Sequence, residues 1–589
     1  MHRLKLTSWS LVAAMLLAAG LTCNSKAGAQ ASEPQTASPT ATPATSPKND
    51  EVKILKDQLA LQQKQIDQLQ KALEEQKQLL QTIQTNQAET TSQTASSTSQ
   101  STAGGQASPS PNLGGNLGQV ASLTPVIPAA TPVAVATPGP TPAEESSPVQ
   151  FHIGDAYVTP VGFMDFTSVW RSHDGGSGIG TNFSSIPYGT SFQSNLSEFR
   201  LSMQNSRVGF RVDALVKGAH VLGYMESDFL GNNPTNAQVS SNSNTLRSRV
   251  YFLDVTRGNW EVLGGQTWSL ITPGRTGISP IPGDLFYTQN IDVNYQLGLF
   301  WGRIPELRLV YHPSNKVAVA VALDSPEQYV GGSSGGSSVT FPSALSATYG
   351  SELDTGGTGT GVPNVAPDII AKLAVDPSKK VHFEIGGVER NFKVWNPTTT
   401  TRYSAEGGGG FLNLNVEVAK GFRLLTNNFV SDGGGRYIFG QAPDLIAKAD
   451  GSISLIHADS TVSGFEFTHK NALIYAYYGG IYVGRNVAIV STSTTSGTPP
   501  VTTTTLTPVG YGFTGSSSGQ NRAVQEATFG FNQTIWKDPK WGAVNFMGQY
   551  SYLTRNPWYV ATGQPANASL NMVFFDLRYT LPGKAPTLK

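Results

Sequence analysis

The residue with the clearest chemical potential in this sequence is arginine, which recurs at alternate positions of extended runs. The segments SEFRLS, SRVGFR and LRSRV each place arginine beside apolar residues. Because successive side chains of a β-strand point to opposite faces, the arginines of a run share one face. A guanidinium stays charged and presents a planar fork that matches a carboxylate, so such a wall would attract anionic solutes. The candidate residues are Arg200, Arg207, Arg211, Arg247 and Arg249.

The same parity places large apolar residues on the opposite face of these runs. If that face contacts lipid, the arginines point into a water-filled lumen, because an arginine that faces lipid at mid-membrane costs about 2 to 4 kcal/mol. The residues that we expect to face lipid are Phe199, Leu201, Val208, Phe210, Val250 and Phe252.

Carboxylates in and beside these runs give the arginines a second interpretation. Glu226 and Asp228 are candidates for the lumen wall, and Glu198 and Asp213 lie in the arginine-bearing runs. These acids could neutralise the arginines in a salt-bridge network that only stiffens the wall. A track for anions and a structural network both fit the sequence.

The segment 270–296 is long and contains three prolines and Asp284. We expect it to fold inward and narrow a channel, with Asp284, and also Asp292, facing the arginines. The alternative is an ordinary external loop, since long loops have many uses.

Catalytic and cofactor motifs are weak in this sequence. Residues 515–519 match G-x-S-x-G around Ser517, but they lie in a Ser/Gly-rich stretch and not between a strand and a helix. The eight histidines are dispersed, and no metal or phosphate motif accompanies them. The sequence therefore predicts no enzyme activity and no cofactor.

The element that must position these residues is a β-strand with one apolar face. Alternation of this kind recurs from residue 150 onward, in runs of roughly ten residues, the length that a tilted membrane strand needs. Very short turns, expected at Asn205-Ser206 and Pro377-Ser378, alternate with long Gly/Ser/Thr loops at 172–195, 327–367 and 490–520. The pattern predicts an all-β protein, a transmembrane antiparallel β-barrel of about 16 strands, or 18, that leaves a water-filled channel.

The amino-acid composition argues against some binding partners and covalent links. The 40 Lys+Arg balance the 40 Asp+Glu, so net charge gives no attraction to nucleic acid. The single cysteine, Cys23, lies near the amino terminus, so disulfides are not expected in the barrel.

The amino terminus has the features of an export signal. Basic residues precede the apolar run 11–20, which is too short to span a bilayer, and Ala27-Gly28-Ala29 offers small residues for cleavage. We expect residues 1–29 to be a signal peptide. Lipidation at Cys23 is the alternative, although Gly20-Leu21-Thr22 is a poor lipobox.

Between the signal and the barrel, residues 49–85 show a heptad pattern that predicts an α-helical coiled coil. The pattern leaves the number of helices open. Residues 30–48 are expected to be disordered, and 86–149 form a Ser/Thr/Pro/Ala/Gly-rich linker. The barrel then occupies 150–589. The first-seam positions are Val52, Leu59, Ile66, Leu73 and Leu80.

The ordered motifs of the barrel region resemble the DcaP-like outer-membrane porins, including acidobacterial-type porins, over about 158–582. This resemblance implies a coiled coil, a linker and a trimeric barrel that admits small polar solutes, with a leaning towards anions such as dicarboxylates. The motifs are Ser206–Arg211, Met225–Phe229, Gly265–Ser269, Gly433–Tyr437 and Gln549–Leu553.

The sequence thus favours a passive diffusion channel of the bacterial outer membrane. We expect a homotrimer in the lipid bilayer whose coiled coil, on the periplasmic side, supports assembly or reaches the peptidoglycan. Two alternatives are a barrel that tethers the coiled coil to the envelope and an adhesin that displays its long loops.

Overall fold

The computed structural model describes residues 149–231, 242–286, 288–332, 338–357, 359 and 361–583. The expected signal peptide, the 30–48 segment, the coiled coil and nearly all of the linker lie outside the described residues, as does Cys23. No helix among the described residues is long and apolar enough to cross a membrane.

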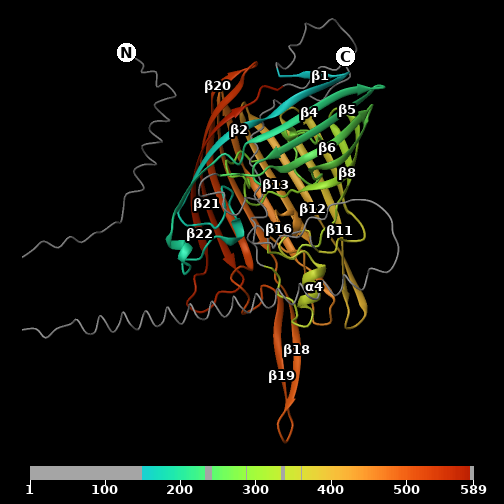
Figure 1. The fold of residues 1–589 in the computed structure, drawn as a ribbon, viewed down its shortest axis with the longest axis vertical. Helices are drawn as coiled ribbons and strands as arrows, with labels where there is room; N and C mark the ends of the chain where they lie inside the picture. The colour runs from blue at the N-terminus through green and yellow to red at the C-terminus, as the bar shows by residue number, and fades with distance from the viewer. Residues whose placement is uncertain are drawn as a thin grey trace, which may run out of the picture. The chain divides into compact units, whose positions relative to one another are not determined.

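A closed antiparallel barrel of 16 strands dominates the described residues. Each strand pairs with the next, and the circle closes between the last strand and the first, where Thr580 pairs with Phe163 (Figure 1). Closure leaves no free sheet edge. The barrel strands are β2 (Ala156–Arg171), β4 (Arg207–Val216), β5 (Ala219–Asp228), β6 (Arg247–Arg257), β7 (Trp260–Trp268), β8 (Arg303–Ser314), β9 (Val317–Asp324), β10 (Asp368–Ser378), β11 (Val381–Asn396), β12 (Thr401–Ala419), β13 (Phe422–Asp432), β16 (His457–His469), β17 (Ala472–Val483), β20 (Asn521–Asp538), β21 (Gly542–Pro557) and β22 (Ala568–Thr580).

Shorter elements lie at the ends of the barrel and in its long connections. The additional strands are β1 (Phe151–Ile153), β3 (Glu198–Ser202), β14 (Leu445–Ala447), β15 (Ile453–Leu455), β18 (Asn486–Ser496) and β19 (Val501–Tyr511). The helical turns are η1 (Phe183–Ser185), η2 (Phe192–Asn195), η3 (Pro282–Asp284), η4 (Gly435–Tyr437) and α4 (Ser346–Glu352).

Side chains alternate across the barrel wall as the sequence predicted. On β9, Val319 and Val321 are 44% and 45% exposed, whereas Ala318 and Ala320, which alternate with them, are buried. Phe199, Leu201, Val208 and Phe210 are likewise exposed on the outside. An apolar outer surface with polar side chains inside is the reverse of a soluble sandwich, in which the apolar faces are buried between sheets.

Asn205-Ser206 is not a turn between two barrel strands, as the sequence had suggested. Thr167 pairs with Ser202 of β3, and Phe163 pairs with Arg207 of β4, so both strands run antiparallel to β2 along the same edge. Side chains bridge the interruption: Ser206 Oγ accepts a hydrogen bond from Asp165 N at 3.0 Å, and Asn205 Nδ2 donates to Asp165 Oδ2 at 3.1 Å. β3 and β4 are therefore two parts of one barrel strand.

The connections differ between the two ends of the barrel. One end carries tight turns, such as Lys217-Gly218 between β4 and β5. Both residues of this turn have positive φ, a conformation that glycine adopts without steric cost at the second position. The predicted Pro377-Ser378 turn lies two residues later, at 379–380, because β10 continues to Ser378. The opposite end carries the long connections, which agrees with the predicted asymmetry.

The long connection between β17 and β20 was expected to be a Gly/Ser/Thr loop, but the structure contains regular strands there. β18 and β19 pair along their length to form a two-stranded hairpin that projects beyond the barrel (Figure 1). Hydroxyl groups bridge its strands, as between Thr495 and Thr502 at 2.8 Å. Its β-branched residues favour this extended ribbon.

A β-bulge in β6 reverses the expected orientation of Val250 and Phe252. Glu226 pairs with Val250 while Ser227 pairs with Ser248, so Arg249 is an extra residue. Val250 and Phe252 consequently point inward and are buried, and Tyr251 faces out at 59% exposed. The prediction that these two residues face lipid was wrong, because a bulge shifts the parity of the strand.

The outward wall can be tested with a charge. We expect Val321→Arg to destabilise the barrel in phospholipid vesicles by about 2 to 4 kcal/mol, because residue 321 faces the hydrocarbon. Val501→Arg is the matched control, since Val501 is 61% exposed on the hairpin; its cost should stay within about 0.5 kcal/mol. Denaturant unfolding measures both, and equal costs for the two variants would refute the lipid-facing assignment.

Candidate functional site

Three of the predicted arginines, Arg207 of β4 and Arg247 and Arg249 of β6, meet the carboxylates of β5 inside the barrel. Arg249 donates to Glu226 at 2.7 Å and to Asp228 at 2.8 Å. Arg207 pairs with Glu226 at 3.3 Å, and Arg247 pairs with Asp228 at 2.8 Å. These five residues form one network, which we call the arginine cluster. These contacts have the geometry of the salt-bridge network that the sequence analysis gave as the second interpretation of the arginines.

The remaining two predicted arginines lie outside the arginine cluster. Arg211 pairs with Asp213 through Nε at 2.7 Å, and His220 contacts the same carboxylate at 3.0 Å. Arg200 pairs with Glu198 at 2.7 Å, a carboxylate that it shares with Arg171. The structure therefore distributes the five arginines over three groups.

Arg303, which the sequence analysis did not select, joins the arginine cluster from β8. Its guanidinium carbon lies 5.5 Å from the centre of the Trp268 ring, and it interacts electrostatically with Arg247, Arg249 and Asp228. Among the described residues it forms no ion pair, and its Nε and Nη1 atoms are buried without a hydrogen-bond partner. Strand parity alone could not have found it, because Arg303 has the same parity as Pro305 and Leu307, which are exposed on β8.

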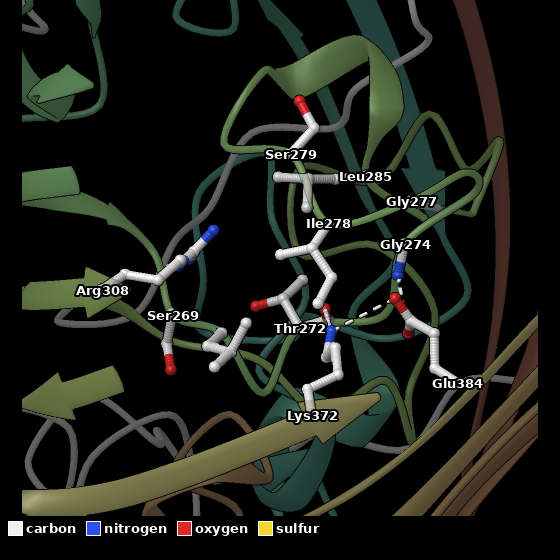
Figure 2. Close-up of a pocket in the computed structure, with 11 residues that line it drawn as sticks. Ser269, Thr272, Gly274, Gly277, Ile278, Ser279, Leu285, Arg308, Lys372 and Glu384 are labelled. Atoms are coloured by element: carbon white, nitrogen blue, oxygen red, sulfur yellow. Dashed lines mark hydrogen bonds and ion pairs between the residues drawn. The ribbon is translucent and has the colours of Figure 1, made fainter. Parts of the chain in front are cut away.

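The connection between β7 and β8, residues 269–302, folds into the barrel as predicted; we call it the inner loop. Lys372 of β10 donates to Thr272 O at 2.7 Å and to Glu384 Oε1 at 3.3 Å. Glu384 of β11 also accepts a hydrogen bond from Gly274 N at 3.0 Å. Figure 2 shows both side chains reaching the loop from the wall, around a small cavity.

The far half of the inner loop binds the wall formed by β17, β20 and β21. Gln289 N donates to Tyr477 Oη at 3.1 Å, and Leu297 N donates to Glu526 Oε2 at 2.9 Å. Ile291 N donates to the side chain of Gln549. Since its two halves bind β10–β11 and β17–β21, the loop crosses the barrel interior.

The two loop acids lie in different places. Asp284 interacts electrostatically with Arg211, and burial raises the pKa of its carboxyl to about 6. Asp292 does not face the predicted arginines. Its Oδ1 accepts hydrogen bonds from Thr181 N at 3.3 Å and from Asn294 N at 2.9 Å, and Arg171 is the nearby cation.

Ion pairs occupy other parts of the interior wall as well, so the arginines are not confined to one sector. Arg390 pairs with Asp368 at 3.0 Å, and Arg578 pairs with Asp576 at 3.0 Å. Arg578 alternates with Leu577 and Tyr579, so the parity that selected Arg207 could also have selected it, whereas Arg390 is flanked by Glu389 and Asn391 and gives no such signal.

The motif around Ser517 lies in the connection between β19 and β20, where Ser517 Oγ accepts a hydrogen bond from Gly519 N at 3.1 Å. It is not a strand-to-helix nucleophile elbow. Within the described ranges, no group of three or more His, Cys, Asp or Glu residues is arranged to hold a metal ion.

Comparison with solved structures finds proteins with a similar barrel fold. No protein-family model and no curated protein matches the sequence. The DcaP outer membrane channel of Acinetobacter baumannii has a TM-score of 0.50 and 16% identity, covering 72% of this chain and 97% of that chain. An anion-selective porin from Comamonas acidovorans has a TM-score of 0.40 and 12% identity, covering 72% and 99%. The described part of the chain has the fold of an outer-membrane porin of the DcaP type.

Proposed function

We propose that the protein is a porin of the bacterial outer membrane, through which small hydrophilic solutes diffuse passively and anions pass preferentially. The observation that carries this proposal is the inner loop, which crosses a closed barrel between β10–β11 and β17–β21. A loop held across the lumen narrows the route and brings passing solutes close to the charged wall.

The preference for anions rests on unequal charge in and around the arginine cluster. Glu226 and Asp228 are the two carboxylates that bind its arginines. Arg207, Arg247, Arg249 and Arg303 supply four guanidiniums. Four guanidiniums against two carboxylates give the described residues of this region an excess of positive charge. This excess attracts anionic solutes such as carboxylates. The arginines, Glu226, Asp228 and Asp284 are the proposed lining residues.

The assembly is part of the same proposal. The resemblance to DcaP-like porins and the 49–85 heptads support a homotrimer in the lipid bilayer, with the coiled coil in the periplasm and within reach of the peptidoglycan. The short-turn end of the barrel would then face the periplasm, and the long connections would face outward.

Anion preference can be tested with Arg303→Gln. In planar bilayers with a salt gradient, the parent channel should show a reversal potential shifted towards the chloride potential, and the variant should lose part of that shift. Arg303 is a suitable target because removing it leaves no carboxylate unpaired within the described residues, whereas removing Arg249 would strand Glu226 and Asp228.

Arg402→Gln is the matched control for this measurement. It removes one positive charge from an exposed residue of β12 that forms no ion pair in the part of the chain that the structure describes. Its reversal potential should equal that of the parent. If Arg303→Gln leaves the potential unchanged, the proposed anion selectivity is wrong, and a channel that gives no conductance steps would refute the porin function itself.

The inner loop can be displaced through Gly479. A Cβ atom at Gly479 would overlap the carbonyl oxygen of Leu297, so Gly479→Ala should push the loop off the wall of β17. We expect a loss of about 1 to 3 kcal/mol in stability and a larger single-channel conductance than in the parent.

The adjacent Gly480→Ala variant is the control, since the nearest atom to its Cβ is the hydroxyl of Tyr478 at 3.7 Å. It should retain the stability and the conductance of the parent. Identical conductance in the two variants would show that the contact between the inner loop and β17 does not limit the channel.

A further inference from the structure

Three residues from neighbouring strands meet at the long-loop end of the barrel. Trp558 follows the end of β21, Arg522 lies near the start of β20, and Arg485 follows the end of β17 by two residues. Because β17, β20 and β21 are adjacent in the barrel, the three side chains converge although they come from separate segments. We call this group the rim cluster.

The indole of Trp558 organises the rim cluster. The guanidinium carbon of Arg485 lies 4.8 Å from the ring centre, and that of Arg522 lies 6.0 Å from it. Trp558 Nε1 donates a hydrogen bond to Val483 O at 2.9 Å, which fixes the ring. Cation–π attraction thus holds two guanidiniums beside one indole.

Neither guanidinium has a counterion in the part of the chain that the structure describes. Among the described residues no carboxylate lies within ion-pairing distance of Arg485 or Arg522, and both residues are exposed. Arg207, Arg247 and Arg249 inside the barrel differ, since each of them contacts Glu226 or Asp228. Two like charges repel each other, so an anion bound between them would relieve the repulsion.

The rim cluster lies on the outer side of the wall, where the apolar surface ends. The ring of Tyr482 lies 6.1 Å from that of Trp558. Tyr482 and Tyr478 are exposed in the same outward row of β17. Tyrosine and tryptophan prefer the level of the lipid headgroups. In the proposed orientation, this level belongs to the outer leaflet.

We propose that the rim cluster binds the phosphate group of an outer-leaflet glycolipid. Each guanidinium offers a planar pair of N–H donors that matches two phosphate oxygens, and the adjacent aromatic surface contacts the apolar part of the same lipid. Phosphate is the shared chemistry of a lipid headgroup and of free inorganic phosphate, and the position beside Tyr482 favours the lipid. The membrane level assigned to the site rests on the proposed outer-membrane function.

Retention of lipid A tests this site. The full chain is purified in detergent with diphosphoryl lipid A, and bound lipid is counted by native mass spectrometry. We expect the double variant Arg485→Gln, Arg522→Gln to retain lipid A at least about tenfold less than the parent, because it loses two charge-assisted contacts. Arg257→Gln, an exposed arginine at the short-turn end, should bind as the parent does.

Competition separates the two phosphate sources. Displacement of lipid A by millimolar inorganic phosphate, and weaker retention of monophosphoryl lipid A, would support recognition through phosphate. Equal retention by the double variant and the parent would overturn the site, as would inorganic phosphate binding without retention of lipid A. Conductance of the parent and of the double variant is recorded in parallel. Normal conductance of the double variant with lost lipid separates this site from the channel, whereas a parent that retains lipid A but gives no conductance would refute only the porin function.

Discussion

The hydrogen-bond ladder of a closed antiparallel sheet is the constraint on which the rest of this structure depends. Closure between β22 and β2 pairs the last free edge, so the wall needs no water to satisfy its backbone. Outward side chains can then be apolar, as Val319 and Val321 are. Charged side chains such as Arg207, Arg249 and Arg308 in turn point inward and are buried, because an apolar outer surface solvates them poorly.

This inward concentration of charge explains the wall of ion pairs. A buried guanidinium is costly unless a carboxylate accompanies it, and Arg249 accordingly has both Glu226 and Asp228. Other carboxylates of the wall hold the inner loop, since Glu384 and Glu526 accept hydrogen bonds from its backbone N–H groups. The wall therefore positions the loop across the barrel interior.

At two places the strict alternation of inward and outward side chains does not predict the structure. Asn205 and Ser206 replace ladder hydrogen bonds with side-chain bonds to Asp165, so a sequence that reads as a turn continues one strand. The bulge at Arg249 places Arg249 and Val250 on the same side of the wall. Both features depend on the partner strand, which the local sequence does not contain.

The sequence by itself determined the fold class and the inward side of Arg207 and Arg211, because alternation is a local property of the chain. It left the course of the inner loop open between an inward fold and an external loop. The tertiary structure decided which residues of the chain contact one another. Leu297 meets Glu526 across 229 positions, and Arg303 of β8 interacts with Arg249 of β6 and lies beside Trp268 of β7. Barrel closure sets these contacts, since it brings together residues whose spacing in the chain carries no signal of their proximity.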